Sequence, residues 1–296
     1  MSSFPFVFII NMRERTERKE KMEKLMQQIG ITEYEFIIPV EITEETIPEE
    51  YRKNRMNKGN TSLNLTILTK IFPKIQREIR RDFIVMEDDL MSTIPVTKVK
   101  EHIVHILREV PKDWNMIYLE YCLEMCSLAP KTPTKNPSSL SVLKKAFHPY
   151  CAAAILFRYN TADSVYKCIK TKKNPLSFTY SSCIYNKELV AYIADPPVFA
   201  QDVLMQGDLA HTESPWNIHF YLNRILKMYD TDATISKPRL PACIDSIETL
   251  DYIRWWNVGW ILMSIVFLLG LYRYRKYIFF VGKNERKLHT NRLRNL

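Results

Sequence analysis

Three consecutive carboxylates follow an apolar run in the segment DFIVMEDDL, residues 82–90. Hard divalent cations such as Mg²⁺ and Mn²⁺ take oxygen ligands, and commonly combine one or two protein carboxylates with phosphate oxygens of a ligand. Because side chains alternate along a strand, Glu87 and Asp89 should share one direction while Asp88 takes the other. We therefore expect Asp89 to be the first metal ligand, with Glu87 or Asp88 as its helper. A solvated acidic turn is the alternative interpretation.

A group of basic side chains surrounds the start of the first expected helix: Arg13, Arg15, Arg18 and Lys19. Cations at a helix N-terminus oppose the helix dipole, at a cost of roughly 0.3–1 kcal/mol each. A bound phosphate would turn this arrangement into a site, because helix N-termini and arginines both attract anions. The alternative is a solvated face, since glutamates at 14, 17 and 20 interleave with these bases.

The elements that would position these side chains alternate between strands and helices. Apolar runs predict strands at 4–10, 34–40, 82–86, 115–121, 151–157 and 188–194. Helical spacing predicts helices over 15–29, 61–81 with an interruption at Pro73, 96–109, and from about 160 onward. Such alternation predicts an α/β fold with a mostly parallel sheet covered on both faces. Ligands of such sheets bind outside the carboxyl ends of the strands, where the acidic triplet falls.

Together, the two motifs resemble the family-25 glycosyltransferases, which include lipooligosaccharide and collagen galactosyltransferases and relatives in large DNA viruses. That family opens with a strand, an Ile-Asn-Leu sequence and two arginines spaced three apart. Here residues 10–12 read Ile-Asn-Met, and Arg15 and Arg18 follow. A later apolar strand of the family ends in Glu-Asp-Asp, as residues 87–89 do.

The resemblance spans about residues 4–205. Segment 111–121 looks like the family's aspartate-tryptophan strand, and 196–201 is similar to its proline-rich segment before a late glutamine, here Gln201. It implies a GT-A-type nucleotide-diphospho-sugar transferase fold and transfer of a hexose from a nucleotide-sugar donor to a glycan, lipid or protein acceptor. It also implies Mn²⁺ or Mg²⁺ at the acidic triplet, and a donor site near Asn11, Arg15 and Arg18.

One segment departs from the family's pattern. The family usually has Gly-Glu, and later Ser-His, before the helix that precedes the acidic strand. Here Gly59 remains, but Asn60 stands where Glu is expected, with Thr66 for Ser and Ile67 for His. Loss of a carboxylate and an imidazole would abolish turnover while leaving the fold and donor pocket intact. A catalytically degenerate membrane scaffold is therefore the alternative function.

A metal-dependent phosphoesterase built on the same triplet is a third interpretation. It would require further carboxylates or histidines to converge on the site. The candidates are Asp195, Asp202 and Asp208, although nothing in the sequence places them there.

The formal net charge of +9 is concentrated near the end of the 296-residue sequence. Residues 273–296 contain eight Lys or Arg and one Glu, so the rest of the chain is close to neutral. A nucleic-acid-binding domain needs basic residues clustered on the domain itself. We therefore expect no nucleic-acid partner.

Residues 255–272, WWNVGWILMSIVFLLGLY, contain no charged side chain. As a helix this segment would reach about 27 Å, which is enough to cross a hydrocarbon core. Tryptophans lie at one boundary, and tyrosines with cations at the other. We expect a transferase-like domain over 1–250, a single transmembrane helix over 255–272 and a basic tail over 273–296, with a buried core helix as the alternative.

Two signals disagree on the orientation of this expected span. No convincing signal peptide precedes the large domain, which favours a cytosolic domain. The basic tail favours the opposite orientation under the positive-inside rule. From the sequence alone we favour the cytosolic domain.

Six cysteines are distributed along the chain at 122, 126, 151, 168, 183 and 243. Only the first two are close in sequence, and no second close pair completes a zinc site. The even count would permit disulfides, but the chain is larger than a disulfide-stapled miniprotein. We expect free thiols in a reducing compartment.

Overall fold

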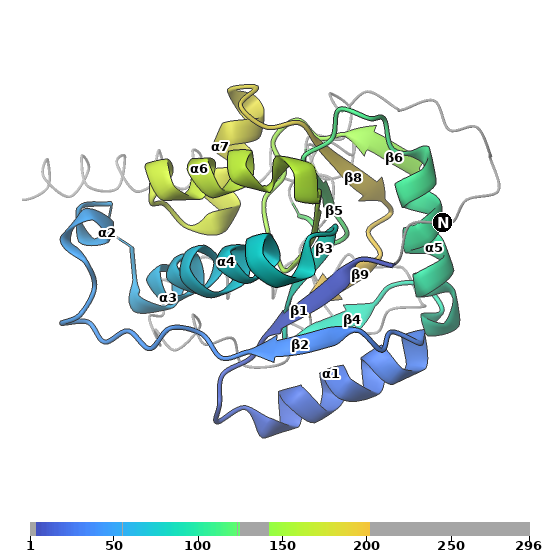
Figure 1. The fold of residues 1–296 in the computed structure, drawn as a ribbon, viewed down its shortest axis with the longest axis horizontal. Helices are drawn as coiled ribbons and strands as arrows, with labels where there is room; N and C mark the ends of the chain where they lie inside the picture. The colour runs from blue at the N-terminus through green and yellow to red at the C-terminus, as the bar shows by residue number, and fades with distance from the viewer. Residues whose placement is uncertain (1–3, 55, 123, 125–141, 202–296) are drawn as a thin grey trace, which may run out of the picture. The chain divides into compact units, whose positions relative to one another are not determined.

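A computed structural model of the chain describes residues 4–54, 56–122, 124 and 142–201, which form a mixed sheet with helices on both faces (Figure 1). The sheet runs, in spatial order, β2 (Tyr34–Ile37), β1 (Phe6–Ile10), β3 (Phe83–Glu87), β7 (Ala154–Phe157), β5 (Met116–Tyr118), β8 (Ala191–Asp195) and β6 (Val142–Lys145). β7 is antiparallel to both of its neighbours and β6 is antiparallel to β8, whereas the other pairings are parallel. The predicted α/β fold is confirmed, with five strands running in one direction and two against it.

Helices α1 (Thr16–Ile29) and α5 (Val96–Glu109) cover one face of the sheet. The stripe predicted for the first helix is buried there, with Met22 and Met26 fully inaccessible. The first helix ends at Gly30, whose φ of 76° is a left-handed conformation that glycine adopts without strain. The amphipathic pattern of the sequence therefore fixes which side of α1 faces β1 and β3.

The other face is covered by a long helical segment and two later helices. The segment consists of α3 (Lys58–Thr66), the π-helical turns η1 (Ile67–Ile71) and η2 (Ile75–Ile79), and α4 (Phe72–Lys74) between them. Pro73 has no N–H to donate, which is consistent with the wider turns on either side of it. Asn57 caps the start, since its Oδ1 accepts from the Asn60 N–H at 2.8 Å. The helix predicted over 61–81 is thus present, but helical turns continue through Pro73, where α-helical turns replace π-helical ones instead of an interruption.

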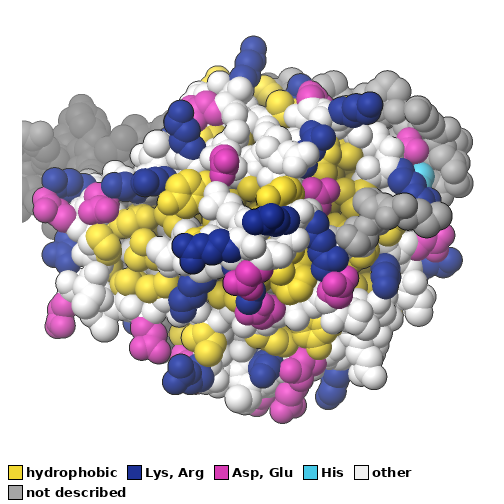
Figure 2. Space-filling model, in the orientation of Figure 1, with side chains coloured by type: hydrophobic (Ala, Val, Ile, Leu, Met, Phe, Trp, Pro, Cys, Tyr) yellow, Lys and Arg dark blue, Asp and Glu magenta, His cyan; other side chains and the backbone are white. Residues whose placement is uncertain are grey.

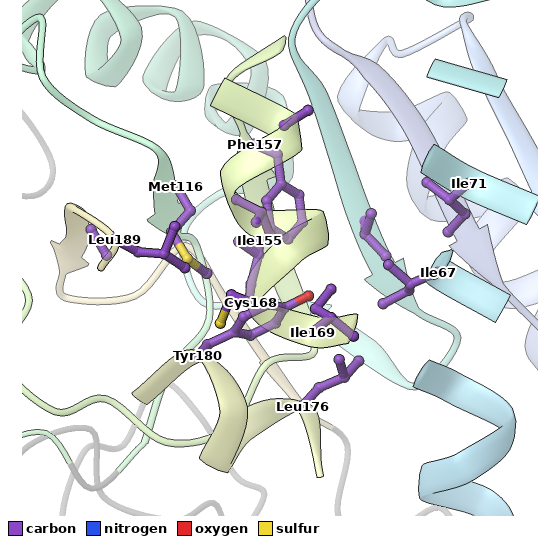
Figure 3. Packing of buried hydrophobic residues seen from close by; sticks show 14 of the residues in the cluster. Ile67, Ile71, Met116, Ile155, Phe157, Cys168, Ile169, Leu176, Tyr180 and Leu189 are labelled. Atoms are coloured by element: carbon purple, nitrogen blue, oxygen red, sulfur yellow. The ribbon is translucent and has the colours of Figure 1, made fainter. Parts of the chain in front are cut away.

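Helices α6 (Ala162–Lys172) and α7 (Leu176–Tyr185) pack against the sheet through an apolar cluster (Figure 3). Phe157 of β7 lies against Tyr180 of α7, with ring centroids 6.0 Å apart. Ile155 and Ile169 fill the space beside these rings, and both are buried. This packing fixes α7 against the middle strands of the sheet.

Several short elements were not predicted from the sequence. They are α2 (Glu49–Lys53), η3 (Tyr159–Thr161), the strand β6, the helix α7, and a small second sheet in which β4 (Leu90–Ser92) pairs with β9 (Phe199–Gln201). Within the described ranges no helix is long and apolar enough to cross a membrane. The expected transmembrane segment 255–272 and the basic tail lie outside the described residues.

The expectation of free thiols is wrong for the four described cysteines. Cys122 is bonded to Cys151 with their Cα atoms 5.4 Å apart, and Cys168 is bonded to Cys183 at 6.5 Å. The first bond joins the segment after β5 to the segment before β7, which is its antiparallel neighbour; the second joins α6 to α7. Both pairs are brought together by tertiary packing, so their spacing in the sequence does not indicate them.

Charged side chains on the face drawn in Figure 2 are mixed in sign, with Lys and Arg interspersed among Asp and Glu. Exposed ion pairs occur among the described residues, for example Lys53–Glu49 at 2.8 Å. Exposed pairs of this kind contribute little to stability, roughly 0–1 kcal/mol each. This face therefore shows no extended patch of a single sign.

Candidate functional site

The acidic triplet and the start of α1 meet in one buried cluster. Strands β1 and β3 are parallel neighbours with Ile10 opposite Glu87, so the residues that follow each strand lie side by side. Asn11 Nδ2 donates to Asp88 Oδ2 at 2.7 Å. Arg18 Nη1 donates to Asp88 Oδ1 at 2.8 Å, and both side chains are under one tenth exposed. Two motifs about 70 positions apart in sequence thus form a single site.

The triplet divides its side chains between two directions. Asp88 faces α1, whereas Glu87 and Asp89 both interact with Gln201 of β9. Gln201 Nε2 donates to Glu87 Oε2 at 3.3 Å. A hydrogen bond from the Gln201 side chain to Asp89 lowers the pKa of that carboxyl, against the larger effect of burial. Gln201 reaches this position because it pairs with Leu90 in the small second sheet. The division agrees with the alternation expected at a strand end.

A fourth carboxylate, Glu120, joins the cluster and was missed by the sequence reasoning. It follows β5 and is 5% exposed. Its Oε2 accepts from the Ala153 N–H at 3.0 Å, and the Ala153 carbonyl accepts from the Glu87 N–H at 2.8 Å. The signal was available, because Glu120 closes an apolar strand in the same way as the triplet does. What the sequence does not show is that β5 and β3 are both neighbours of β7.

The charges in this cluster are poorly balanced. Burial raises the pKa of Glu87 to about 8, with the charges of Asp89 and Glu120 adding to the shift and that of Arg18 opposing it. Burial also raises the pKa of Glu120 to about 8. Burial also raises the pKa of Asp89, and the charge of Arg18 partly opposes that shift. Such a site at neutral pH gains stability by holding protons or by binding a cation.

The residues fit a hard divalent cation at Asp89. Its Oδ1 is buried and has no hydrogen-bond partner among the described residues, which leaves a lone pair available to a cation. Glu87 is the neighbouring carboxylate on the same side. Within the described ranges no group of three or more His, Cys, Asp or Glu side chains is arranged to hold a metal alone. Each oxygen of Asp88 accepts one hydrogen bond, Oδ2 from Asn11 and Oδ1 from Arg18.

The other predicted donor residue on α1 is Arg15. It is half-buried at the N-terminal end of the helix, and its carbonyl accepts from Asn11 Nδ2 at 3.1 Å. Asn11 therefore connects the helix start to the acidic turn through both of its bonds. Arg18 was predicted to bind the donor, but the structure commits its guanidinium to Asp88.

The segment that departs from the family pattern runs from the first turn of α3, with Gly59 and Asn60, to its last residue Thr66 and to Ile67, which begins η1. Among the described residues, Gly59 and Asn60 make no hydrogen bond or ion pair with the acidic cluster. Thr66, where the pattern has serine, accepts from the Val40 N–H at 2.8 Å and so ties α3 to the segment after β2. The hydroxyl of this position is therefore used structurally.

Of the three aspartates that the sequence offered to a phosphoesterase, only Asp195 is described, and it does not join Glu120 in the cluster. Asp195 forms an ion pair with Lys144 and accepts from the Tyr121 hydroxyl at 3.1 Å. Asp202 and Asp208 lie outside the described residues. The phosphoesterase interpretation therefore gains no support here.

Comparisons with known proteins add little. No family model matches the chain, and no curated protein matches it. Among solved structures, that of apo-UDP-glucose pyrophosphorylase matches with a TM-score of 0.31 and 10% identity, covering 64% of this chain and 73% of that one. A similarity at this level carries no argument about fold or activity, so the resemblance to the family-25 glycosyltransferases stays a prediction.

Proposed function

We propose that this protein is a nucleotide-sugar-dependent glycosyltransferase that holds the donor diphosphate through Mn²⁺ or Mg²⁺ at Asp89 and Glu87. The observation that carries the proposal is the direct contact of Asn11 and Arg18 with Asp88. This contact places the acidic turn at the N-terminal end of α1, where a diphosphate would meet carboxylate-bound metal on one side and helix N–H groups on the other. The open lone pair of Asp89 supports the metal part of the proposal.

Each side chain of the cluster has its own role in the proposed site. A bound cation would neutralise charge on the departing diphosphate. Asp89 is the first ligand, and Gln201 orients Glu87 beside it. The Arg18–Asp88 pair holds α1 against the acidic turn, and Arg15, one turn earlier, contacts the donor. Arg18 is thus a positioning residue.

A thermal-shift screen tests the proposal. Wild-type protein with Mn²⁺ should be stabilised by at least one UDP-, GDP- or CMP-linked sugar, because a ligand that binds only the folded state raises its stability. The Asp89→Asn variant should remain folded and lose that shift. Glu45→Gln, which removes an exposed carboxylate, should retain it. The proposal fails if no donor shifts the wild-type protein, or if Asp89→Asn behaves as Glu45→Gln does.

A non-catalytic scaffold on the same fold is the second candidate. The observation that favours it is that Asn60, which stands where the family has Glu, makes no hydrogen bond or ion pair with the acidic cluster among the described residues. Under this candidate a donor binds but no turnover follows. An Asn60→Glu/Ile67→His variant that gains donor hydrolysis absent from wild type would support the scaffold, whereas hydrolysis by wild type would exclude it.

We also propose that residues 255–272 anchor the protein in a membrane with the α/β domain on the oxidising side. Two disulfides in the described domain support that side, because reducing compartments keep thiols reduced. The basic tail would then lie in the cytosol, in agreement with the positive-inside rule. Protease treatment of sealed membranes should leave the domain intact until detergent is added. Digestion without detergent would contradict this orientation.

A further inference from the structure

We infer a binding site for the sugar ring of a carbohydrate acceptor, an inference that rests on the proposed function. The site is a group of five aromatic side chains, which we call the acceptor platform: Phe147, His148, Tyr150, Phe178 and Tyr185. The first three come from the segment between β6 and β7, and the last two from α7. None of them was singled out by the sequence reasoning as a ligand-binding residue.

The platform is a continuous set of ring contacts. His148 lies 5.0 Å from Tyr150 and 5.7 Å from Tyr185, measured between ring centroids. Phe147 lies 5.8 Å from Tyr185, and Phe178 lies 5.3 Å from Tyr150. All four contacts are edge-on, an arrangement that aromatic quadrupoles favour. In each such pair the edge of one ring covers part of one face of the other, so a ligand would have to reach the face that is turned away from the contact.

Two of these rings are strongly exposed. Phe178 is 56% exposed and Tyr185 is 59% exposed, and they are two of the three exposed large hydrophobic side chains in the described ranges. They lie seven positions apart on α7, so they share one side of the helix. The opposite side carries Leu176 and Tyr180 into the core (Figure 3). Adjacent exposed aromatic rings of this kind mark binding surfaces more often than single exposed side chains do.

The platform is held in place before any ligand binds. The carboxylate of Glu124 accepts from the N–H groups of Phe147 and His148 at 3.0–3.1 Å. Tyr150 exchanges two backbone hydrogen bonds with Cys122, each of 3.0 Å. Cys122 is in turn bonded to Cys151. A surface fixed in this way loses little conformational entropy when a ligand binds.

The same backbone connects the platform to the acidic cluster. Ala153 lies three residues after Tyr150, which places it within about 11 Å by chain length. The N–H of Ala153 donates a hydrogen bond to the Glu120 carboxylate, and its carbonyl accepts one from the Glu87 N–H. An acceptor whose ring lies on the platform would need to bring its reacting hydroxyl close to the proposed donor site. Transfer requires such proximity between acceptor and donor.

The chemistry of the platform matches a sugar ring. Ring faces carry negative charge density, which attracts the positively polarised C–H groups on one face of a pyranose. The hydroxyls of Tyr150 and Tyr185 and the ring nitrogens of His148 supply donors and acceptors for the sugar hydroxyls around that face. This combination of apolar faces with polar rims favours a carbohydrate over a purely apolar partner.

Saturation-transfer NMR on the full-length protein tests the inference. The probes are the methyl pyranosides of glucose, galactose, mannose and N-acetylglucosamine at millimolar concentration. At least one should receive saturation at its ring C–H protons from wild type, and the signal should fall at least fivefold in Phe178→Ala and in Tyr185→Ala. The matched control is Ile38→Ala, which truncates the third exposed hydrophobic side chain and should keep the signal.

Thermal-shift and saturation-transfer results together distinguish this inference from the proposed function. Thermal shifts with the nucleotide-sugar donor should be unchanged in both platform variants, because within the described ranges neither residue bonds to the acidic cluster. The inference is overturned if no pyranoside receives saturation from wild type, or if the platform variants match Ile38→Ala. It is also overturned if the variants instead dissociate a wild-type oligomer, since the platform would then be a protein interface. If no nucleotide-sugar donor produced a thermal shift in the wild-type protein while a pyranoside still bound to it, only the proposed function would be overturned.

Discussion

Arg18 and Asp88 form a buried ion pair that joins the first helix to the turn after β3, with 2.8 Å between Nη1 and Oδ1. The pair determines how the acidic triplet is used. It turns Asp88 toward α1, whereas Glu87 and Asp89 both interact with Gln201. It also fixes the N-terminal part of α1 beside these carboxylates. A site of this kind requires both segments to be held together before a ligand arrives.

The ion pair predicts a large loss of stability when one partner is removed. Arg18→Met should lower the free energy of unfolding by about 3–5 kcal/mol, because it leaves the Asp88 carboxylate buried without its cation. Replacing both partners, in Arg18→Met/Asp88→Leu, should restore much of the loss. Urea denaturation of the three proteins measures both effects. A double variant as unstable as the single one would show that the pair is not what the substitution disrupts.

The buried carboxylates predict that stability without metal falls as pH rises. Burial raises the pKa of Glu120 from 4.5 to about 8, so between these values the folded state binds more protons than the unfolded state. The free energy of unfolding then decreases with increasing pH across this window. Glu120→Gln keeps an acceptor for the Ala153 N–H but cannot ionise, so it should flatten this dependence and be more stable than wild type at pH 8.

Chemical denaturation at several pH values, in a chelator, measures this slope. The matched control is Glu45→Gln, which changes an exposed carboxylate and should leave the slope as in wild type. If Glu120→Gln were less stable than wild type at pH 8, the fold would favour the charged form of Glu120, and burial would not be the dominant influence on this carboxylate.

The disulfide between α6 and α7 predicts a defined stability change. Cys168 and Cys183 are 15 positions apart, and closing a loop of this length contributes about 3 kcal/mol by restricting the unfolded chain. A Cys168→Ser/Cys183→Ser variant should therefore unfold at lower urea concentration. Alkylation of the unfolded wild-type protein before reduction tests whether Cys168 and Cys183 are bonded, because a disulfide protects both thiols from the reagent. Labelling of both wild-type cysteines without reductant would contradict the disulfide.

Much of the fold follows from the sequence because its long elements are strongly patterned. The apolar runs at β1 and β3 and the stripe on α1 predict these elements and the sides they bury. Shorter elements escape this reasoning: β6 and the β4–β9 pair have three or four residues each, too few for a periodic pattern. α7 escapes for another reason, since its exposed side carries Phe178 and Tyr185 and so gives it no amphipathic pattern.

The candidate site was predictable only in part. The motifs that contain Asn11 and Asp88 are visible in the sequence because each follows a strand, and parallel neighbours bring such ends together. The contribution of Glu120 depends on β7 lying antiparallel between β3 and β5, which no local pattern reveals. The ion pair of Arg18 with Asp88 was not predicted for a related reason, because a basic residue at a helix start can pair with protein or with ligand alike.

Binding of Mn²⁺, followed by electron paramagnetic resonance with and without UDP or GDP, is the decisive test of a metal-bridged diphosphate at the acidic turn. We predict that a nucleoside diphosphate tightens Mn²⁺ binding to wild type at least tenfold, or about 1.4 kcal/mol. Asp89→Asn should lose that coupling while Glu45→Gln keeps it. Equal Mn²⁺ binding by wild type and Asp89→Asn, with no effect of either diphosphate, would contradict a metal site at Asp89.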